Sequence, residues 1–325
     1  MVNTATKIIF ILFFTGVTQL LYGQDLFGSY NLPYPAYKYE EILDKRDPVL
    51  QRSLEKIINR NTLWRKLVYQ KRMAVALVDL RQADNIKYAS INGSHMMYAA
   101  SLPKIAVLLS AIEAVDEGCL EYTEALQKDL RLMIAKSNNA ATTRVIEAIG
   151  FDKIAETMTK DKYKLYDINN GGGLWVGKKY AKSGRKKPDP LKGLSHAATV
   201  DQVARFYTML AYEKLVSSEW NEQLMGYLIE PEINHKFVKA LKKLTPKVDI
   251  YRKSGSWKHF HCDSALVFGE DGRKYILVTL IDDFRGGMIC SNLVSSAEQA
   301  LGIQNVPYFP KIIKDNTLNF FPLQK

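Results

Sequence analysis

Ser101-Leu102-Pro103-Lys104 is the stretch of sequence that decides the fold. It follows a strand-like segment at residues 96–100 and begins a pattern in which apolar residues recur at three- and four-residue spacing, as in a helix. Pro103 falls in the first turn, where its missing N–H group needs no partner. Because Ser101 and Lys104 are three residues apart, they share a face of such a helix. The stretch therefore predicts a serine and a lysine presented together where a helix begins.

A serine hydroxyl and a lysine at this spacing suggest nucleophilic chemistry. The hydroxyl is a poor nucleophile at neutral pH and needs a base within hydrogen-bond reach. A lysine can serve only if burial or neighbouring cations lower its pKa. The same four letters also describe an ordinary helix start with a solvated lysine, so the motif needs partners elsewhere in the chain.

Two further motifs follow in order along the chain. Ser137-Asn138-Asn139 brings a hydroxyl and carboxamides to a helix junction, where ordinary helix capping is the alternative role. Lys253-Ser254-Gly255-Ser256-Trp257 lies in an extended stretch, and its glycine would let a ligand approach the backbone closely. A lysine at a strand edge beside a bulge is the alternative there. With Lys253 facing Lys104, such a basic cluster would lower the pKa of Lys104.

The hydrophobic pattern places strands at both ends of the chain and helices between them. Residues 73–78 and 86–91 form a predicted hairpin, and residues 264–268 and 275–281 form a second one around a Gly-Glu-Asp-Gly turn. Helices are expected at residues 48–58, after Ser101, at 199–210 and at 291–301. Residues 161–197 are rich in Gly, Asn and Pro and are interpreted as a long surface loop.

Together these motifs and their surroundings resemble the class A β-lactamase and penicillin-binding-protein superfamily, whose SxxK, SDN and KTG motifs occur in this order. The resemblance runs from about residue 73 to residue 301. It implies an α/β (α+β) fold in which an antiparallel sheet is flanked by helices and carries an inserted helical lobe. The expected organisation is a signal peptide at 1–23, an arm and first helix at 24–70, a catalytic domain at 71–305 and a tail at 306–325. The sheet would come from 71–100 and 245–305, and the lobe from 101–244.

The resemblance also implies a role for each motif residue. Ser101 would be acylated, Lys104 would activate it, and Ser137 would relay a proton to the leaving nitrogen. Lys253 and Ser254 would bind the substrate carboxylate. The candidate catalytic residues are thus Ser101, Lys104, Ser137 and Lys253, and the candidate substrate-binding residues are Asn139, Ser254, Gly255 and Ser256. In this scheme Asn139 holds a substrate amide, Gly255 keeps the strand edge open, and the backbone N–H groups of Ser101 and Ser256 form an oxyanion hole.

The sequence departs from the family pattern at several points. Asn138 replaces the usual Asp, and Ser254 replaces the frequent Thr while keeping the hydroxyl. Ser137 lies only 36 residues after Ser101, which predicts a reduced helical lobe. Between Glu156 and Glu213 there is no glutamate, although class A enzymes use one in this region to activate the deacylating water.

Three aspartates lie in or beside the loop without a glutamate: Asp161, Asp167 and Asp189. Asp189, between two prolines, is the best candidate for a base that acts through water. A structural role in a turn is the alternative and is favoured.

Three functions are compatible with these observations. The leading one is a serine hydrolase of the β-lactamase type that opens the β-lactam amide through an acyl-enzyme on Ser101. The second is a D-alanyl peptidase like the penicillin-binding proteins, and the third is a penicillin sensor that is acylated without turnover. The substrate is accordingly a small β-lactam or a D-alanyl peptide, and no cofactor is expected.

A metal site is not expected, although His259-Phe260-His261-Cys262-Asp263 mimics the HxHxD run of metal-dependent β-lactamases. Such zinc sites need further histidines downstream, and none of the five histidines follows His261.

The N-terminus and the overall charge indicate where the protein acts. Lys7, an apolar run and a transition to polar and small residues are typical of a cleaved signal peptide, so we expect a periplasmic or secreted monomer without a stable membrane span.

The net charge of +11 is scattered, and its densest run, at residues 178–187, is interpreted as a solvated loop. A nucleic-acid partner is therefore not expected, whereas anionic substrates stay open. The three cysteines allow at most one disulfide.

Overall fold

The computed structural model describes residues 34, 37–245, 247–269 and 272–303. The predicted signal peptide, most of the lead segment before residue 37 and the predicted tail lie outside these residues. Within them, no helix is both long enough and apolar enough to cross a bilayer.

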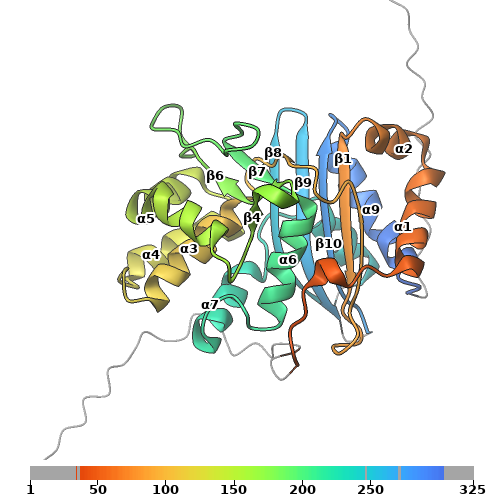
Figure 1. Cartoon of the computed structure of the whole chain (residues 1–325), viewed down its shortest axis with the longest axis horizontal. Coiled ribbons are helices and arrows are strands. Elements are labelled where there is room, and N and C mark those ends of the chain that lie inside the picture. The colour runs from red at the N-terminus through yellow and green to blue at the C-terminus, as the bar shows by residue number, and fades with distance from the viewer. Residues whose placement is uncertain (1–33, 35–36, 246, 270–271, 304–325) are drawn as a thin grey trace, which may run out of the picture.

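A five-stranded antiparallel sheet forms the centre of the molecule (Figure 1). Its order is β2(Lys87–Ile91), β1(Met73–Asp79), β10(Lys274–Asp282), β9(Phe260–Gly269) and β8(Val248–Trp257). Both predicted hairpins are confirmed, because β1 pairs with β2 and β9 pairs with β10 in antiparallel register. Strand β9 begins at Phe260, earlier than predicted, because it pairs with β8 along the whole length of both strands.

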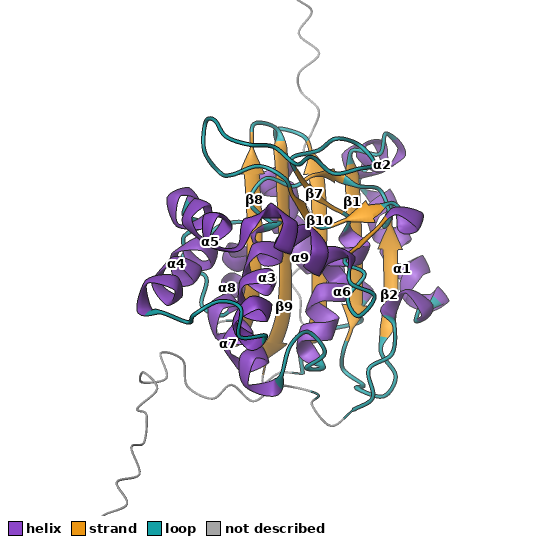
Figure 2. Ribbon diagram, turned by 60° about the vertical axis from the view of Figure 1, so that its left-hand side comes forward, coloured by secondary structure: helices purple, strands orange, loops and turns teal. Residues whose placement is uncertain are grey.

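Helices cover both faces of this sheet (Figure 2). Alternate residues of a strand point to opposite faces. In β1, Met73, Val75 and Leu77 pack against one hydrophobic cluster, whereas Ala74, Ala76 and Val78 pack against the other. The first cluster includes apolar side chains of α1(Pro48–Arg60), α2(Thr62–Tyr69), α8(Phe237–Leu244) and α9(Gly286–Ala300), and the second includes those of α6(Val200–Ala211). Both faces are covered, and the strand is accordingly apolar from Met73 to Val78.

A helical lobe lies beside the sheet, opposite α1 and α9 (Figure 1). It contains α3(Lys104–Asp116), α4(Glu124–Ala135), α5(Asn139–Thr159) and, beneath them, α7(Ser218–Leu228). Almost every residue of α3 is buried, which makes it the central helix of the lobe. The predicted fold class, an antiparallel sheet flanked by helices with an inserted helical lobe, is therefore confirmed. The predicted helices at 48–58 and 199–210 correspond to α1 and α6, whereas α9 begins earlier than expected.

The expectation of one long surface loop at residues 161–197 is wrong. Four short strands and a 3-10 helix, η2(Ile168–Asn170), occur there: β4(Tyr166–Asp167), β5(Gly172–Gly173), β6(Trp175–Val176) and β7(His196–Ala198). Strand β7 pairs with β6 and with β3(Met97–Tyr98). This pairing holds in place the segment that leads to Ser101. Strands of two or three residues are too short to show an alternating pattern, which is why the sequence did not reveal them.

A buried ion pair joins β8 to β9. Arg252 Nε lies 2.7 Å from Asp263 Oδ1, and Arg252 Nη2 lies 2.8 Å from Asp263 Oδ2. Both side chains are almost fully buried, and Asp263 Oδ2 also accepts a hydrogen bond from the Phe237 backbone N–H at 3.1 Å. The carboxylate therefore connects the hairpin to the start of α8.

Removing the negative charge of this pair should destabilise the fold. In Asp263→Asn the Arg252 guanidinium stays buried without its counter-ion, so we expect a loss of about 3–5 kcal/mol in the free energy of unfolding, measured by urea denaturation. Asp129→Asn is the matched control, because its partner Arg144 is largely exposed, and it should cost less than about 1 kcal/mol. Equal losses in the two variants would contradict the prediction.

Candidate active site

A cavity of about 770 Å³ opens where the lobe meets the edge of the sheet. Its lining comes from four parts of the chain: the segment from β3 to the turn before α3, the first residue of α5, the segment from the end of β6 to the start of β7, and the β8–β9 hairpin. Ser101, Asn139 and Ser256 are among the residues that line it. Parts of all three sequence motifs therefore meet at one cavity.

Ser101 lies in a turn before α3 and not in its first helical turn as predicted. In this Ser101 turn (residues 99–103), the Leu102 N–H donates to Ala99 O at 3.0 Å, and helix α3 begins at Lys104. Ala100 has a φ of 49°, a left-handed conformation that is strained for a residue with a Cβ. The turn presents the half-buried Ser101 to the cavity.

Lys104 is completely buried and reaches the second motif. Its Nζ donates to Ser137 O at 2.7 Å, to Asn139 Oδ1 at 2.8 Å and to Ser137 Oγ at 3.3 Å. Burial lowers the pKa of Lys104 to about 7, so the amine is partly neutral at neutral pH. We expected both burial and the nearby Lys253 to lower this pKa, and burial is the cause that the structure supports. Among the described residues, Lys104 Nζ makes no hydrogen bond to Ser101 Oγ.

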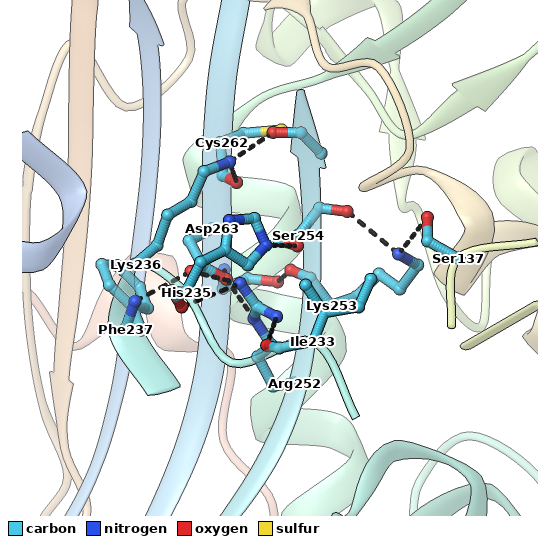
Figure 3. Close-up of polar contacts among 12 residues, drawn as sticks. Ser137, Ile233, His235, Lys236, Phe237, Arg252, Lys253, Ser254, Cys262 and Asp263 are labelled. Carbon is cyan, nitrogen blue, oxygen red and sulfur yellow. Dashed lines mark hydrogen bonds and ion pairs between the residues drawn. The ribbon is translucent and has the colours of Figure 1, made fainter. Parts of the chain in front are cut away.

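The Ser137 hydroxyl lies between two lysines. Lys253 Nζ donates to Ser137 Oγ at 3.0 Å (Figure 3). Lys104 Nζ donates to the same oxygen at 3.3 Å. Lys253 is buried, and desolvation followed by its proximity to Lys104 lowers its pKa well below the usual value. Ser137 itself has a strained φ of 55°. Proton movement between two nitrogens through one hydroxyl is chemically possible in this arrangement.

Gly255 brings the edge strand against the Ser101 turn. A Cβ at this position would lie 2.4 Å from Ala99 O and 2.7 Å from Ser101 N. Such distances are shorter than any real contact, so only glycine allows β8 to lie this close. The sequence suggested that the glycine admits a ligand, whereas the structure shows that it admits the protein's own backbone.

The remaining predicted binding residues lie around the same edge. Ser254 is buried, and its hydroxyl lies 3.4 Å from His235 Nε2 (Figure 3). Ser256 lines the cavity, and its hydroxyl accepts a hydrogen bond from Lys236 Nζ at 2.8 Å. Asn139 also lines the cavity, although its amide oxygen is occupied by Lys104.

Sequence reasoning missed three residues that border this site: Tyr180, His235 and Lys236. The Tyr180 hydroxyl donates to Ala100 O at 3.0 Å, and Lys236 Nζ donates to Gly255 O at 2.6 Å. Burial followed by the nearby Arg252 lowers the pKa of His235 to about 4, so this imidazole is neutral at neutral pH. No short motif marks these residues, because each acts through contacts with distant parts of the chain.

The basic run at residues 178–187 is not only a solvated loop. Lys178, Lys179 and Lys182 line the cavity together with Lys258 of the β8–β9 turn. Lys179 also pairs with Glu147 at 2.7 Å. This rim gives the mouth of the cavity a positive charge.

The three loop aspartates do not line the cavity. Asp189 is buried, and its Oδ1 accepts hydrogen bonds at 3.0 Å from the Tyr166 hydroxyl and from the N–H groups of Leu191 and Lys192. Asp167 caps the 3-10 helix η2, and Asp161 lies 3.8 Å from Lys164 at the surface. The favoured structural role of Asp189 is thereby supported, and within the described ranges no carboxylate faces the cavity.

The histidine and cysteine side chains have other contacts in the described part of the chain. In the described part of the chain, no group of three or more His, Cys, Asp or Glu side chains could hold a metal ion. His259 instead pairs with Asp282, and Cys262 Sγ donates to Ala99 O at 2.9 Å. All three cysteines are described, and none of them forms a disulfide.

A lysine of lowered pKa, a hydroxyl held between two lysines and a serine at the start of a central helix define a class, the β-lactamase-like serine hydrolases. A model of the β-lactamase enzyme family matches residues 53–129 and 125–302. This match spans well over half of the chain, and the protein belongs to that family. A comparison with curated protein sequences finds no match.

Solved structures share the fold at low sequence identity. A β-lactamase from Sphaerobacter thermophilus is 15% identical, with 80% of this chain and 98% of that chain covered and a TM-score of 0.59. A class A β-lactamase from Bacteroides cellulosilyticus is 15% identical, with coverage of 78% and 99% and the same TM-score. The protein PBP-A is 17% identical, with coverage of 78% and 96% and a TM-score of 0.58. The serine β-lactamase fold predicted from the motifs is therefore confirmed.

Adding a methyl group at Gly255 should disrupt the edge of the sheet. Gly255→Ala would push a Cβ into backbone atoms of the Ser101 turn, so we expect a loss of about 1–3 kcal/mol in unfolding free energy. In α9, Gly287→Ala is the control, since the nearest atom to its Cβ would be 3.9 Å away. That helix substitution should be neutral or stabilise by up to about 1 kcal/mol. A neutral Gly255→Ala variant would rule out the tight contact.

Proposed function

We propose that this protein opens the amide bond of β-lactams by forming an acyl-enzyme on Ser101. The observation that carries the proposal is the Ser137 hydroxyl between Lys104 and Lys253, next to a cavity lined by Ser101. Buried lysines of low pKa can accept a proton near neutral pH, which a solvated lysine cannot do.

In the proposed acylation, neutral Lys104 takes the proton of Ser101 while Ser101 Oγ attacks the carbonyl carbon of the substrate. The developing oxyanion is stabilised by the backbone N–H groups of Ser101 and Ser256. When the C–N bond breaks, the proton passes from Lys104 through the Ser137 hydroxyl to the leaving nitrogen. The Lys104–Ser101 contact has to form in the substrate complex, as often happens with catalytic hydrogen bonds that are long without substrate.

Substrate recognition in this proposal depends on the positive rim and the strand edge. Lys253 and Ser254 bind the substrate carboxylate, and Asn139 receives a substrate amide after releasing Lys104. Lys178, Lys182 and Lys258 supply positive charge at the mouth of the cavity, which supports an anionic substrate.

A D-alanyl peptidase is the second candidate function, and a specific observation favours it. Asp189 is held by hydrogen bonds within its loop, and no carboxylate faces the cavity in the described part of the chain. Without a carboxylate to activate water, the β-lactam adduct is hydrolysed slowly. A peptidase with the same Ser101 acyl-enzyme would have the peptide as its rapid substrate and would be inhibited by penicillin.

We further propose that residues 71–305 act as the catalytic domain of a monomer outside the cytoplasm. Strands from both ends of this range complete one sheet, which supports its treatment as a unit. The apolar run after Lys7 supports export.

Intact-mass spectrometry tests the acyl-enzyme directly. We expect mature protein incubated with a penicillin to gain the mass of the drug, and Ser101→Ala to gain nothing. A transient adduct with turnover of a chromogenic cephalosporin supports the lactamase, and a persistent adduct with cleavage of a D-alanyl peptide supports the peptidase. A persistent adduct without either activity would leave a penicillin sensor. No adduct on the wild-type protein would overturn the whole proposal.

The acylation rate should depend on pH through Lys104. This amine accepts a proton only when neutral, and its pKa is about 7. The rate should therefore rise with pH, by about tenfold per unit well below 7, and level off above it. His196 and His235, whose pKa values are about 4, do not titrate in that window.

Stopped-flow acylation by a fluorescent penicillin between about pH 5.5 and 8.5 measures this profile. Lys104→Arg is the control, because a guanidinium stays protonated throughout and should lower the rate at every pH. A flat wild-type profile would exclude Lys104 as the base.

A further inference from the structure

We propose that Lys236 and Tyr180 strengthen the two N–H donors of the oxyanion hole by hydrogen-bonding the carbonyl oxygens of the same peptide groups. The inference rests on the proposed function, which uses the N–H groups of Ser101 and Ser256. The N–H of Ser256 belongs to the peptide group that contains Gly255 O, which accepts from Lys236 Nζ at 2.6 Å. The N–H of Ser101 belongs to the group that contains Ala100 O, which accepts from the Tyr180 hydroxyl at 3.0 Å.

A hydrogen bond to a carbonyl oxygen makes the N–H of that peptide a better donor. Peptide resonance moves electron density from nitrogen to oxygen, and a donor at the oxygen favours this form. Hydrogen bonds in series polarise one another for the same reason, more strongly where the local dielectric is low. An oxyanion bound at such an N–H is therefore stabilised more than at an ordinary peptide.

The geometry at Gly255 matches this requirement. Its carbonyl oxygen faces the β9 side of the strand, where Lys236 Nζ and Cys262 Sγ contact it. No described peptide bond is cis, so the Ser256 N–H points the opposite way. Strand β8 is the edge of the sheet, and a Cβ on Gly255 would lie 2.7 Å from Ser101 N, so this nitrogen lies against the face of β8 at Gly255. The Ser256 N–H thus points away from β9 at the open edge of the sheet, and the nitrogens of Ser101 and Ser256 both lie beside Gly255.

The Lys236 ammonium group is held at the Gly255 carbonyl by its hydrogen bonds. It is buried at 3% exposure, and its Nζ donates to Gly255 O, Ser256 Oγ and Cys262 O at 2.6, 2.8 and 3.0 Å (Figure 3). An ammonium group has three donors and no acceptor, so these oxygens use all of them. The residue also has a strained φ of 53°, a cost that proteins retain mainly at functional positions. With its donors occupied, Lys236 acts through the peptide and not by holding substrate.

The Tyr180 ring is also fixed in place by the side chains around it. Its ring centroid lies 4.5 Å from Lys104 Nζ, and the ring packs against that of His196 at an angle of 45° with centroids 4.3 Å apart. Burial raises the pKa of the Tyr180 hydroxyl well above its usual value, so the hydroxyl keeps its proton and remains a donor. Lys236 and Tyr180 are thus positioning residues, one for each peptide of the oxyanion hole.

The infrared carbonyl stretch of the acyl-enzyme tests the inference. With a penicillin carrying a ¹³C-labelled β-lactam carbonyl, the ester on Ser101 gives a band that moves to lower wavenumber as the oxyanion-hole donors strengthen. We expect Lys236→Met and Tyr180→Phe each to shift this band to higher wavenumber and to slow acylation about tenfold, less than the loss of a whole donor. Fluorotyrosine at position 180, a stronger donor, should shift the band the opposite way.

Two matched controls separate polarisation from general loss of a contact. Lys162→Met removes a lysine that donates to Leu215 O at 2.8 Å, and Tyr212→Phe removes a hydroxyl that donates to Ala83 O at 2.5 Å. Both lie away from the cavity and should leave the band and the rate unchanged. A purely structural role for Lys236 or Tyr180 would lower the melting temperature while leaving the wavenumber of the ester at its wild-type value.

Amide chemical shifts measured by NMR give a second readout that needs no adduct. The Ser256 amide proton should move upfield in Lys236→Met, and the Ser101 amide proton should move upfield in Tyr180→Phe. If the wild-type protein forms no acyl-enzyme, the proposed function fails, and the amide shifts still decide whether the peptides are polarised. Unchanged amide shifts, or an unchanged ester band in variants that are acylated, would overturn the inference. Should Lys236→Met fail to fold, the fluorotyrosine and Tyr180→Phe proteins carry the test.

Discussion

The contact between the backbone of β8 at Gly255 and the backbone of the Ser101 turn is the constraint on which the rest of the site depends. It brings the edge of the sheet, formed late in the chain, against the start of the central helix α3. Lys253, two residues earlier on the same strand, can then reach the Ser137 hydroxyl. A side chain at position 255 would separate these elements and break the geometry that the two lysines share.

The sequence predicts the parts of this protein whose information is local. The hairpins of the central sheet follow from alternating apolar runs with polar turns between them, and the candidate site follows from three short motifs in a fixed order. The short strands between residues 161 and 197 could not be predicted in the same way, since two residues cannot establish a period. Their role depends on pairing with β3, a contact that no local pattern encodes.

The sequence did not predict three residues beside the site, Tyr180, His235 and Lys236, for a related reason. Each is a polar residue in a connecting segment. Each matters because its side chain forms a hydrogen bond with a backbone oxygen or a hydroxyl from a distant part of the chain. The sequence predicts that the pKa of Lys104 is lowered but leaves two causes open, burial and neighbouring cations. Burial in the lobe produces it, and burial is a property of packing that the motif alone does not contain.

The site places several cationic or potentially cationic groups in a region of low solvent access with one buried carboxylate to balance them. Asp263 is already paired with Arg252, and among the described residues no carboxylate forms an ion pair with Lys104 or Lys253, whose pKa values are lowered mainly by burial. This arrangement costs stability, as do the left-handed conformations of Ala100, Ser137 and Lys236. Proteins retain such costs mainly where reactivity requires them.

The same lack of carboxylates accounts for an imbalance between the two halves of the proposed reaction. In the proposed reaction, a positive cavity that no described carboxylate lines would attract an anionic substrate and keep Lys104 able to accept the Ser101 proton. Among the described residues it also leaves no anionic base facing the cavity to activate water for deacylation. Asp189 cannot easily take that role, because its oxygens accept the N–H groups that shape its own loop. Turning it toward the cavity would leave those buried donors unsatisfied, so rapid hydrolysis would require both a new carboxylate and a new way to fasten the loop.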